Sequence, residues 1–237
     1  TCSGPMTASM DLFDVTIQGK GTHGAMPHTG TDSVVIAAQL ITAWQTIISR
    51  NISAQESAVI SATSVITGDS WNVIPDSALI KGSIRTLLPA VREQVRERFV
   101  QLTRQLVEGF GASAEIDYRS ITPSMINDSE QTTFACDVAA SIFGEDRVLR
   151  TLPADMGSED FAYMLEQKPG CYLCLGGAPM ETSALISKNI QVAQHVDDFV
   201  YKSACMLHES TYDFNDDMIP LGATLFTRLV EQQLLAR

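Results

Sequence analysis

The periodic segments between residues 11 and 120 follow one another in an order that few folds can accommodate. Residues 11 to 20 alternate between polar and apolar side chains, with Phe13, Val15 and Ile17 on one side, as in a half-buried strand. The segments that follow are a helix at 32–51, strands at 57–67 and 78–87, a helix at 89–109 and a strand at 112–119. The order β-α-β-β-α-β is that of the split-βαβ or ferredoxin-like arrangement, so we expect one compact α+β domain here.

The two helices of this domain have recognisable ends. Asp32 precedes the first apolar periodic stretch and is expected to begin the helix that ends near Asn51. Pro89 opens the second helix, and Gly109 ends it. Apolar residues of the second helix recur at helical spacing, whereas arginines and glutamates occupy its other face. It is the clearest amphipathic helix of the chain.

After Pro123 the pattern changes to α/β character. We expect a helix from about 128 to 143, a short helix at 158–167, a buried strand at 171–175 and a closing helix at 216–235. These elements include too few strands for a complete sheet, and residues 180–206 show no clean period. The sequence therefore predicts two domains, a ferredoxin-like domain at residues 1–122 and an incomplete α/β part at residues 123–237.

Composition excludes several classes of function. The net charge of −12 repels a phosphate backbone, and no basic stripe is present, so we expect no nucleic-acid partner. No apolar run reaches the ~20 residues that span a bilayer, so we expect no membrane association. Five cysteines are few and odd in number, which suits a reducing compartment, and we expect the cytoplasm. The chain opens without Met and almost directly on a strand, as expected for a piece of a longer chain.

Histidines are the first candidates for chemistry. His23 and His28 lie in the glycine-rich loop GKGTHGAMPH at residues 19–28, between a predicted strand and a helix. They could be metal ligands or simply solvated polar loop residues, because a five-residue spacing does not put both on one helical face. His208 is flanked by carboxylates that could hold its second ring nitrogen, as a metal ligand requires, or it is a surface residue before the last helix. His195 lies in the unassigned stretch and has no predicted role.

Other short motifs allow two interpretations each. Cys171 and Cys174 have CxxC spacing, but a single pair inside an apolar run favours core cysteines over a zinc or redox site. Residues 157–160 could cap a helix or line a site. Asn72 belongs to the turn-like sequence NVIPD, and Arg85 in the following strand offers a bidentate donor for a carboxylate.

The order of six motifs carries a family resemblance. The motifs are GKGTHGAMPH (19–28), NVIPD (72–76), GSIRT (82–86), MGSEDFAYML (156–165), PGCYLCLGG (169–177) and LHESTYDFND (207–216). In this order the chain resembles the C-terminal half of the dinuclear-metal amidohydrolases, which include hippurate hydrolase, N-acyl-amino-acid amidohydrolase and the indole-acetyl-amino-acid hydrolases. The resemblance implies a catalytic α/β domain that binds two divalent ions and an inserted ferredoxin-like dimerisation domain, matched by residues 11–120.

The resemblance also implies roles for individual residues. His208 would be a metal ligand, and His23 would reach the partner subunit's active site and hold the carbonyl oxygen as it becomes an oxyanion. Asn72 and Arg85 would bind the carboxylate end of the substrate. The loops that contain Gly157, Ser158, Glu159 and residues 176–177 would line the substrate pocket. His28 has no implied role.

The first half of the family pattern, with its HxCGHD ligand motif, its Glu-Glu pair and a further histidine ligand, is absent from this sequence. In the intact enzyme two Zn or Mn ions would polarise the amide carbonyl and activate a water, and a glutamate would move its proton. We therefore expect a parent enzyme that hydrolyses N-acyl amino acids such as hippurate, and a chain that alone binds metal weakly and is inactive.

Two alternatives remain open. The first is a carboxypeptidase or an aminobenzoyl-glutamate-type hydrolase of the same superfamily. The second is a non-catalytic binding module that pairs edge to edge through the ferredoxin-like domain.

Overall fold

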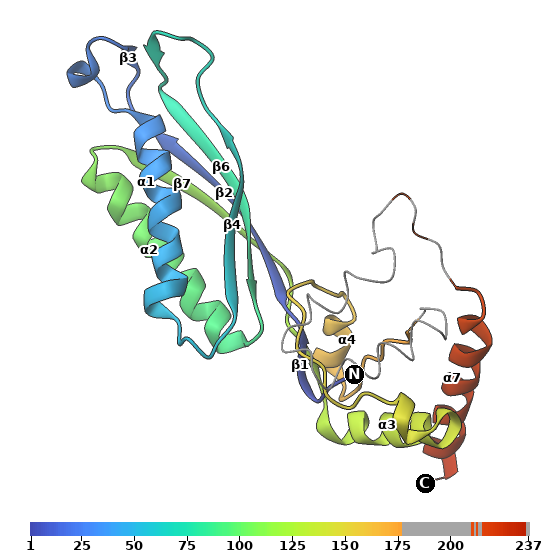
Figure 1. Ribbon diagram of the computed structural model, residues 1–237. Helices are drawn as coiled ribbons and strands as arrows, with labels where there is room; N and C mark the ends of the chain where they lie inside the picture. Colours follow the sequence, from blue (N-terminus) through green and yellow to red (C-terminus); the bar gives the residue numbers. More distant parts are fainter. Residues whose placement is uncertain (177–209, 211, 213–214, 236–237) are drawn as a thin grey trace. The chain divides into compact units, whose positions relative to one another are not determined.

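The computed structural model describes residues 1–176, 210, 212 and 215–235, which belong to two compact units (Figure 1). The larger unit comprises residues 4–127 and 154–169, and the smaller unit comprises residues 1–3, 128–153 and 170–237. The domain boundary at residue 122 stays a prediction. Among the described helices, none is long and apolar enough to cross a membrane.

Four strands form the main sheet within the described part of the larger unit. They are β2 (Ser9–Gln18), β4 (Ala58–Ile66), β6 (Ser77–Thr86) and β7 (Ser113–Thr122), in the order β4-β6-β2-β7. Every neighbouring pair is antiparallel, and Phe13 of β2 lies opposite Gly82 of β6 and Tyr118 of β7. This confirms the predicted ferredoxin-like βαββαβ arrangement.

Two helices cover one face of this sheet (Figure 1). Helix α1 (Ser33–Thr46) begins where predicted, because the Asp32 carboxylate accepts hydrogen bonds from the amides of Val34 and Val35 at 2.9 and 3.1 Å. The π-helical segment η2 (Ile47–Asn51) continues it to the predicted end. Helix α2 (Pro89–Gly109) has the predicted bounds.

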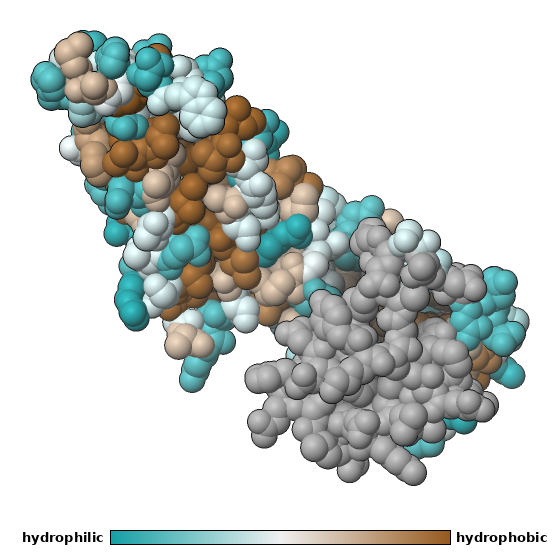
Figure 2. All heavy atoms as spheres, turned by 45° about the horizontal axis from the view of Figure 1, so that its top comes forward, coloured by the Kyte–Doolittle hydropathy of each residue, from teal (hydrophilic) through white to brown (hydrophobic). Residues whose placement is uncertain are grey.

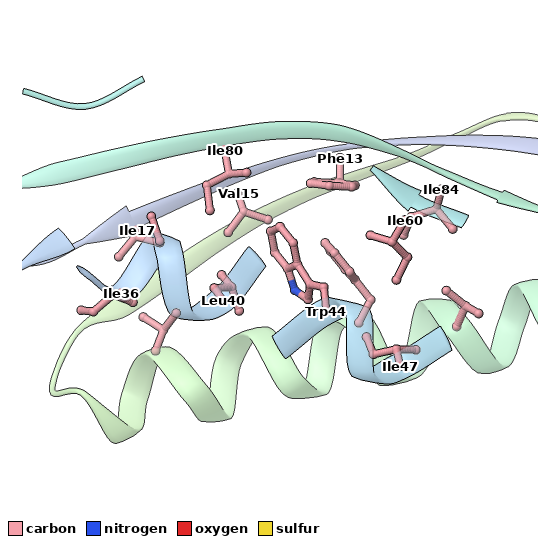
Figure 3. Packing of buried hydrophobic residues seen from close by; sticks show 14 of the residues in the cluster. Phe13, Val15, Ile17, Ile36, Leu40, Trp44, Ile47, Ile60, Ile80 and Ile84 are labelled. Carbon is pink, nitrogen blue, oxygen red and sulfur yellow. The ribbon is translucent and has the colours of Figure 1, made fainter. Parts of the chain in front are cut away.

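The core between sheet and helices is built around three aromatic rings. Phe13, Trp44 and Phe99 are completely buried, and their ring centroids lie 4.7–5.1 Å apart. Branched aliphatic side chains surround them, including Ile60, Ile80 and Ile84 (Figure 3). The Trp44 indole N–H donates to the Thr103 hydroxyl at 2.9 Å, so its polar atom is satisfied inside the core.

Gly82 leaves room for the Phe13 ring against the backbone of β6. A Cβ atom at this position would lie 2.1 Å from the Ser61 carbonyl oxygen and 2.3 Å from the Phe13 ring. Phe13 therefore packs directly over the backbone of β6, which only glycine allows.

An acidic side chain is also buried between sheet and helix. Asp11, which shares the inward face of β2 with Phe13, is completely buried. Arg92 of α2 donates to its carboxylate through Nε, 3.0 Å from Oδ2, and through a second, shorter bond, and the Tyr118 hydroxyl donates at 2.8 Å. Burial and the Asp11 carboxylate raise the pKa of Tyr118 far above its ordinary value, and the same carboxylate raises the pKa of Arg92. The charge of Asp11 is thus compensated where a carboxylate would otherwise be costly.

Shorter elements complete the larger unit. Strand β1 (Gly4–Thr7) pairs with β8 (Met125–Asn127), and strand β3 (Thr22–His23) pairs with β5 (Val73–Ile74) beside the 3-10 turn η1 (Pro27–Thr29). Helix α4 (Ala162–Gln167) starts four residues later than predicted, because residues 159–161 form turns instead. Segment 154–169 is joined to the start of β2 by the Ala8 amide, which donates to the Asp155 and Gly157 carbonyls at 3.0 and 2.8 Å.

The smaller unit contains α3 (Ser129–Phe143), the turn η3 (Glu145–Arg147) and α7 (Met218–Leu235). Both predicted helices are present, and Val138 and Leu225 are buried where they pack together. The predicted strand at 171–175 is wrong, because these residues form no strand and Cys174 is exposed. The Tyr172 carbonyl instead accepts a hydrogen bond from the Thr1 hydroxyl at 2.6 Å. The interpretation of both cysteines as core residues is therefore wrong for Cys174.

Candidate functional site

The histidine loop lies at one end of the larger unit, where it forms a short two-stranded ribbon with the NVIPD segment. His23 pairs with Val73 and Thr22 with Ile74. The Gly24 amide extends this pairing by donating to the Asn72 carbonyl at 2.8 Å. The structure thus brings His23 and Asn72 together, although they are 49 positions apart in the sequence, and β3 lies at one tip of the larger unit (Figure 1).

Backbone bonds close the base of the loop. Lys20 and Thr31 exchange hydrogen bonds of 2.8 and 3.0 Å, and a Cβ atom on Gly30 would lie only 2.4 Å from the Lys20 carbonyl oxygen. The glycine is therefore required by close backbone approach rather than by contact with a ligand. The Gly21 amide donates to the Asp76 carboxylate at 2.7 Å, which ties the two halves of the ribbon together.

His23 is exposed, and one of its ring nitrogens is already engaged. Its Nδ1 accepts a hydrogen bond from the Ala25 amide at 3.0 Å. A neutral imidazole that accepts at Nδ1 carries its proton on Nε2, so the other nitrogen is a donor. In this exposed side chain Nε2 is therefore left as a hydrogen-bond donor, which is what stabilisation of a developing oxyanion requires. His28, in η1, is also exposed and remains without an assigned role.

Asn72 is exposed at the turn that precedes β5. Its side-chain oxygen accepts a hydrogen bond from the Ser70 hydroxyl at 3.1 Å. The amide oxygen is thus held within the turn, while the side-chain NH₂ group is the part suited to donate to a carboxylate.

Arg85 lies near the other end of β6, where it meets the predicted pocket loop. Its guanidinium donates to the Ser158 hydroxyl at 2.9 Å. The neighbouring Gly157 amide donates to the Asp155 carboxylate at 2.6 Å, and Glu159 accepts from the Asp160 amide at 3.1 Å. Arg85, Gly157, Ser158 and Glu159 are therefore grouped at one place in the larger unit, as a shared substrate site would require.

The predicted substrate residues thus fall into two groups. Strand β6 separates the two groups. It runs eight residues from Ser77, next to the ribbon, to Arg85. At ~3.3 Å per residue this corresponds to about 26 Å. One amino-acid carboxylate cannot touch Asn72 and Arg85 of the same chain across such a separation. If Asn72 and Arg85 both bind the carboxylate end of one substrate, they must therefore come from two copies of the chain.

The predicted metal ligand His208 and Gly177 lie outside the described residues. Among residues that the structure describes, no group of three or more His, Cys, Asp or Glu side chains is placed to hold a metal ion. The donors present in this described part of the chain therefore do not form a two-ion site. Burial raises the pKa of the Cys136 thiol, which also makes this cysteine a poor thiolate ligand.

The ribbon and the main sheet lie within a segment that is similar to a known protein family. Residues 9–109 match the family described as the Peptidase dimerisation domain. These residues thus resemble an M20 peptidase dimerisation domain. The M20 match includes both strands of the ribbon, His23 and Asn72, and it confirms the resemblance to the dinuclear metallo-amidohydrolases.

Relatives of the M20 domain belong to amide-hydrolysing enzymes. The chain is 40% identical to N-acetyl-L-cysteine deacetylase of Bacillus subtilis over 73% of this chain and 41% of that protein. It is 30% identical to hippurate hydrolase of Campylobacter jejuni over 98% of this chain and 54% of that protein. The chain spans about half the length of the curated relatives that it matches.

A solved structure of an M20 peptidase is also similar to this chain. The Bacillus subtilis YXEP protein, a dinuclear metal binding peptidase from the M20 family, matches 96% of this chain and 50% of its own chain. The TM-score is 0.68 and the sequence identity is 26%.

Sequence patterns missed two contacts and one exposed side chain in this region. The bonds from Arg85 to Ser158 and from Ala25 to the His23 ring were not predicted, nor was the full exposure of Trp71 beside Asn72. Only the Ala25 contact is local enough for a sequence signal, since a histidine two residues before an amide in a glycine turn can accept from it.

Proposed function

We propose that the full-length protein hydrolyses the amide bond of N-acyl amino acids, with hippurate-like compounds as substrates. The observation that carries this proposal is the hydrogen bond from the Ala25 amide to Nδ1 of the exposed His23, which leaves Nε2 as the donor, within residues that match a peptidase dimerisation domain. A hippurate hydrolase and a deacetylase of an N-acetyl amino acid among the relatives support the substrate class.

His23 would act on the scissile carbonyl. When water adds to an amide, negative charge develops on the carbonyl oxygen, and a preorganised donor lowers the energy of that state. An exposed histidine on a hydrogen-bonded loop can donate in this way only if the carbonyl is held by another part of the protein. His23 would therefore act on a substrate bound by a second copy of the chain.

Arg85 and Ser158 would supply the other half of the site. The guanidinium is charged at any physiological pH and can bind a carboxylate through two parallel hydrogen bonds. Its bond to the Ser158 hydroxyl leaves further N–H groups for a ligand, because arginine has five. Each site would thus combine Arg85, Gly157, Ser158 and Glu159 of one copy with His23 and Asn72 of the other.

The homodimer would form through residues 11–120. Strand β4 lies at an edge of the sheet, has no charged residue and exposes Val59, Val65 and Ile66. The other edge strand, β7, carries Glu115, Asp117 and Arg119. Figure 2 shows hydrophobic side chains gathered in a band along the larger unit. An uncharged, apolar edge strand favours pairing with another strand, so β4 is the edge that we assign to the dimer.

Zn or Mn ions would complete the enzyme. A dinuclear metal binding peptidase is a solved neighbour, and bound divalent ions would polarise the substrate carbonyl. His208 would be one ligand, and the remaining ligands would come from outside this sequence. This chain alone would then bind metal weakly and lack activity. Five cysteines, few and odd in number, suit the reducing cytoplasm, where we place the protein.

Hydrolysis of hippurate and N-acetyl amino acids, measured with Zn or Mn added, tests the proposal. The full-length protein should turn these substrates over, and this chain alone should not. His23→Ala should lower kcat by about 100-fold or more, the loss typical for an oxyanion donor. His28→Ala, on the same exposed loop, is the matched control and should retain activity within about threefold. Equal effects of the two substitutions would contradict the role of His23.

A second candidate is a carboxypeptidase or aminobenzoyl-glutamate-type hydrolase, which the similarity to an M20 peptidase favours. A panel of peptides and aminobenzoyl-glutamate against N-acyl amino acids separates these activities. A non-catalytic dimerisation module is the remaining alternative, and turnover of any of these substrates by the full-length protein would exclude it.

A further inference from the structure

The tip of the larger unit exposes apolar side chains beside His23. Trp71 is fully exposed, at 105% of its reference surface, and Val73 and Met26 are about half exposed, at 52% and 49%. Tryptophan is seldom so exposed, because its ring is among the largest apolar surfaces of any side chain. The only other tryptophan of the sequence, Trp44, is completely buried. Trp71 thus contributes nothing to the core of this unit, which suggests a contact with another molecule.

Hydrogen bonds hold these side chains on a defined frame. Val73 and His23 are a directly opposed cross-strand pair, so their side chains lie on the same face of the ribbon. The Met26 amide donates to the His23 carbonyl, and the Gly24 amide donates to the Asn72 carbonyl, both at 2.8 Å. The two segments are therefore joined before any ligand binds, which lowers the entropy lost when one does.

The chemistry of the tip favours an uncharged, apolar ligand group. Residues 23–27 and 71–75 contain no Asp, Glu, Lys or Arg. His23 and Asn72 offer hydrogen bonds, and the side chains around them offer an indole ring, a thioether and a branched alkyl group. An aromatic ring and a flexible methionine form a surface on which a flat apolar group stacks well.

We propose that Trp71, Met26 and Val73 contact the acyl group of an N-acyl amino acid held by a second copy of this chain, and that they favour aromatic acyl groups. The inference rests on the proposed function, in which His23 donates to the scissile carbonyl oxygen of the other copy. The acyl substituent is bonded to that carbonyl carbon, so side chains that flank His23 lie beside it. The match of residues 9–109 to a dimerisation domain includes this tip and supports a second copy as the partner.

Two pairs of substrates test the assignment on the metal-loaded full-length protein. Benzoylglycine and acetylglycine differ only in the acyl group, whereas acetylglycine and acetylphenylalanine differ only in the amino acid. Trp71→Ala should lower kcat/KM for benzoylglycine about 10- to 100-fold and for acetylglycine less than about threefold. Trp71→Phe keeps an aromatic ring and should stay within about threefold of the wild type on both.

The outcomes separate this inference from the proposed function. A wild type that hydrolyses none of the N-acyl amino acids contradicts the proposed function and the acyl contact with it. A wild type that hydrolyses them, with a benzoyl-to-acetyl preference unchanged by Trp71→Ala, overturns the acyl contact alone. A change in the preference for phenylalanine over glycine would assign Trp71 to the amino-acid side chain and would also overturn it.

Fluorescence gives a readout that does not depend on turnover. The difference between wild type and Trp71→Phe isolates the emission of Trp71. In the metal-free full-length dimer with benzoylglycine bound, acrylamide should quench this emission several-fold less than it quenches free tryptophan. Quenching as strong as that of free tryptophan, in a protein shown to be dimeric and saturated, would contradict the contact.

Discussion

Replacing Asp11 with alanine removes the carboxylate that joins the sheet to α2. The Arg92 guanidinium and the Tyr118 hydroxyl would both lose their acceptor. Breaking a buried ion pair typically costs about 3–5 kcal/mol, because the remaining charge is left without compensation. The Arg92 side chain is 20% exposed, so water can reach part of it. We therefore expect a loss near the lower end, about 3 kcal/mol of unfolding free energy.

The same geometry ranks the three possible substitutions. Arg92→Met leaves the Asp11 carboxylate in place, and that side chain is only 1% exposed, so we expect about 4 kcal/mol or more. Tyr118→Phe removes one hydrogen bond to a charged acceptor and should cost about 1.5–2 kcal/mol. The expected order of destabilisation is thus Arg92→Met, Asp11→Ala and Tyr118→Phe.

Urea unfolding followed through Trp44 measures these differences. Trp44 is buried in the core of the same unit, and a Trp71→Phe background removes the emission of the exposed tryptophan. A loss below about 1 kcal/mol for Asp11→Ala would refute the reasoning. An equal loss of unfolding free energy for Tyr118→Phe and Arg92→Met would also refute it.

Three further predictions follow from other contacts. Gly82→Ala places a Cβ atom against the β4 backbone and the core, and thermal unfolding should show a loss of about 2 kcal/mol or more; a neutral effect would contradict the packing. The pKa of Tyr118 is raised in the folded state, so unfolding free energy should fall as the pH rises above about 10, and Tyr118→Phe should reduce that slope in denaturation at pH 9 and 11. Val59→Lys on β4 should weaken dimerisation at least about tenfold in sedimentation, whereas Glu115→Lys on β7 should leave it unchanged.

The fold was largely predictable because local periodicity determines it. Alternation at residues 11–20 and the capping Asp32 each depend on neighbours within a few positions, and the structure has the strand and helix there. The predicted strand at Cys171 failed because a short apolar run does not distinguish a strand from an irregular segment. Its Tyr172 carbonyl bonds to Thr1, a residue 171 positions away.

The candidate site was predictable only in part. The motif order pointed to His23, Asn72 and Arg85, but no pattern within a motif shows that β6 separates the last from the other two. The partner of Arg85 is Ser158, 73 positions later in the sequence. Asp11 is two residues from Phe13 in an alternating strand, so the sequence indicates that it lies on the same, buried face. Its pairing with Arg92, however, depends on how α2 packs on the sheet.

The central claim, that each active site combines two copies of the chain, is tested most directly by mixing two inactive variants of the full-length protein. His23→Ala and Arg85→Ala lie in different halves of the proposed site, so a mixed dimer has one site with both residues intact and one with neither. Such dimers should regain about half of the wild-type hippurate hydrolysis per dimer. No recovery in mixed dimers, after subunit exchange is verified by mass spectrometry, would contradict the account.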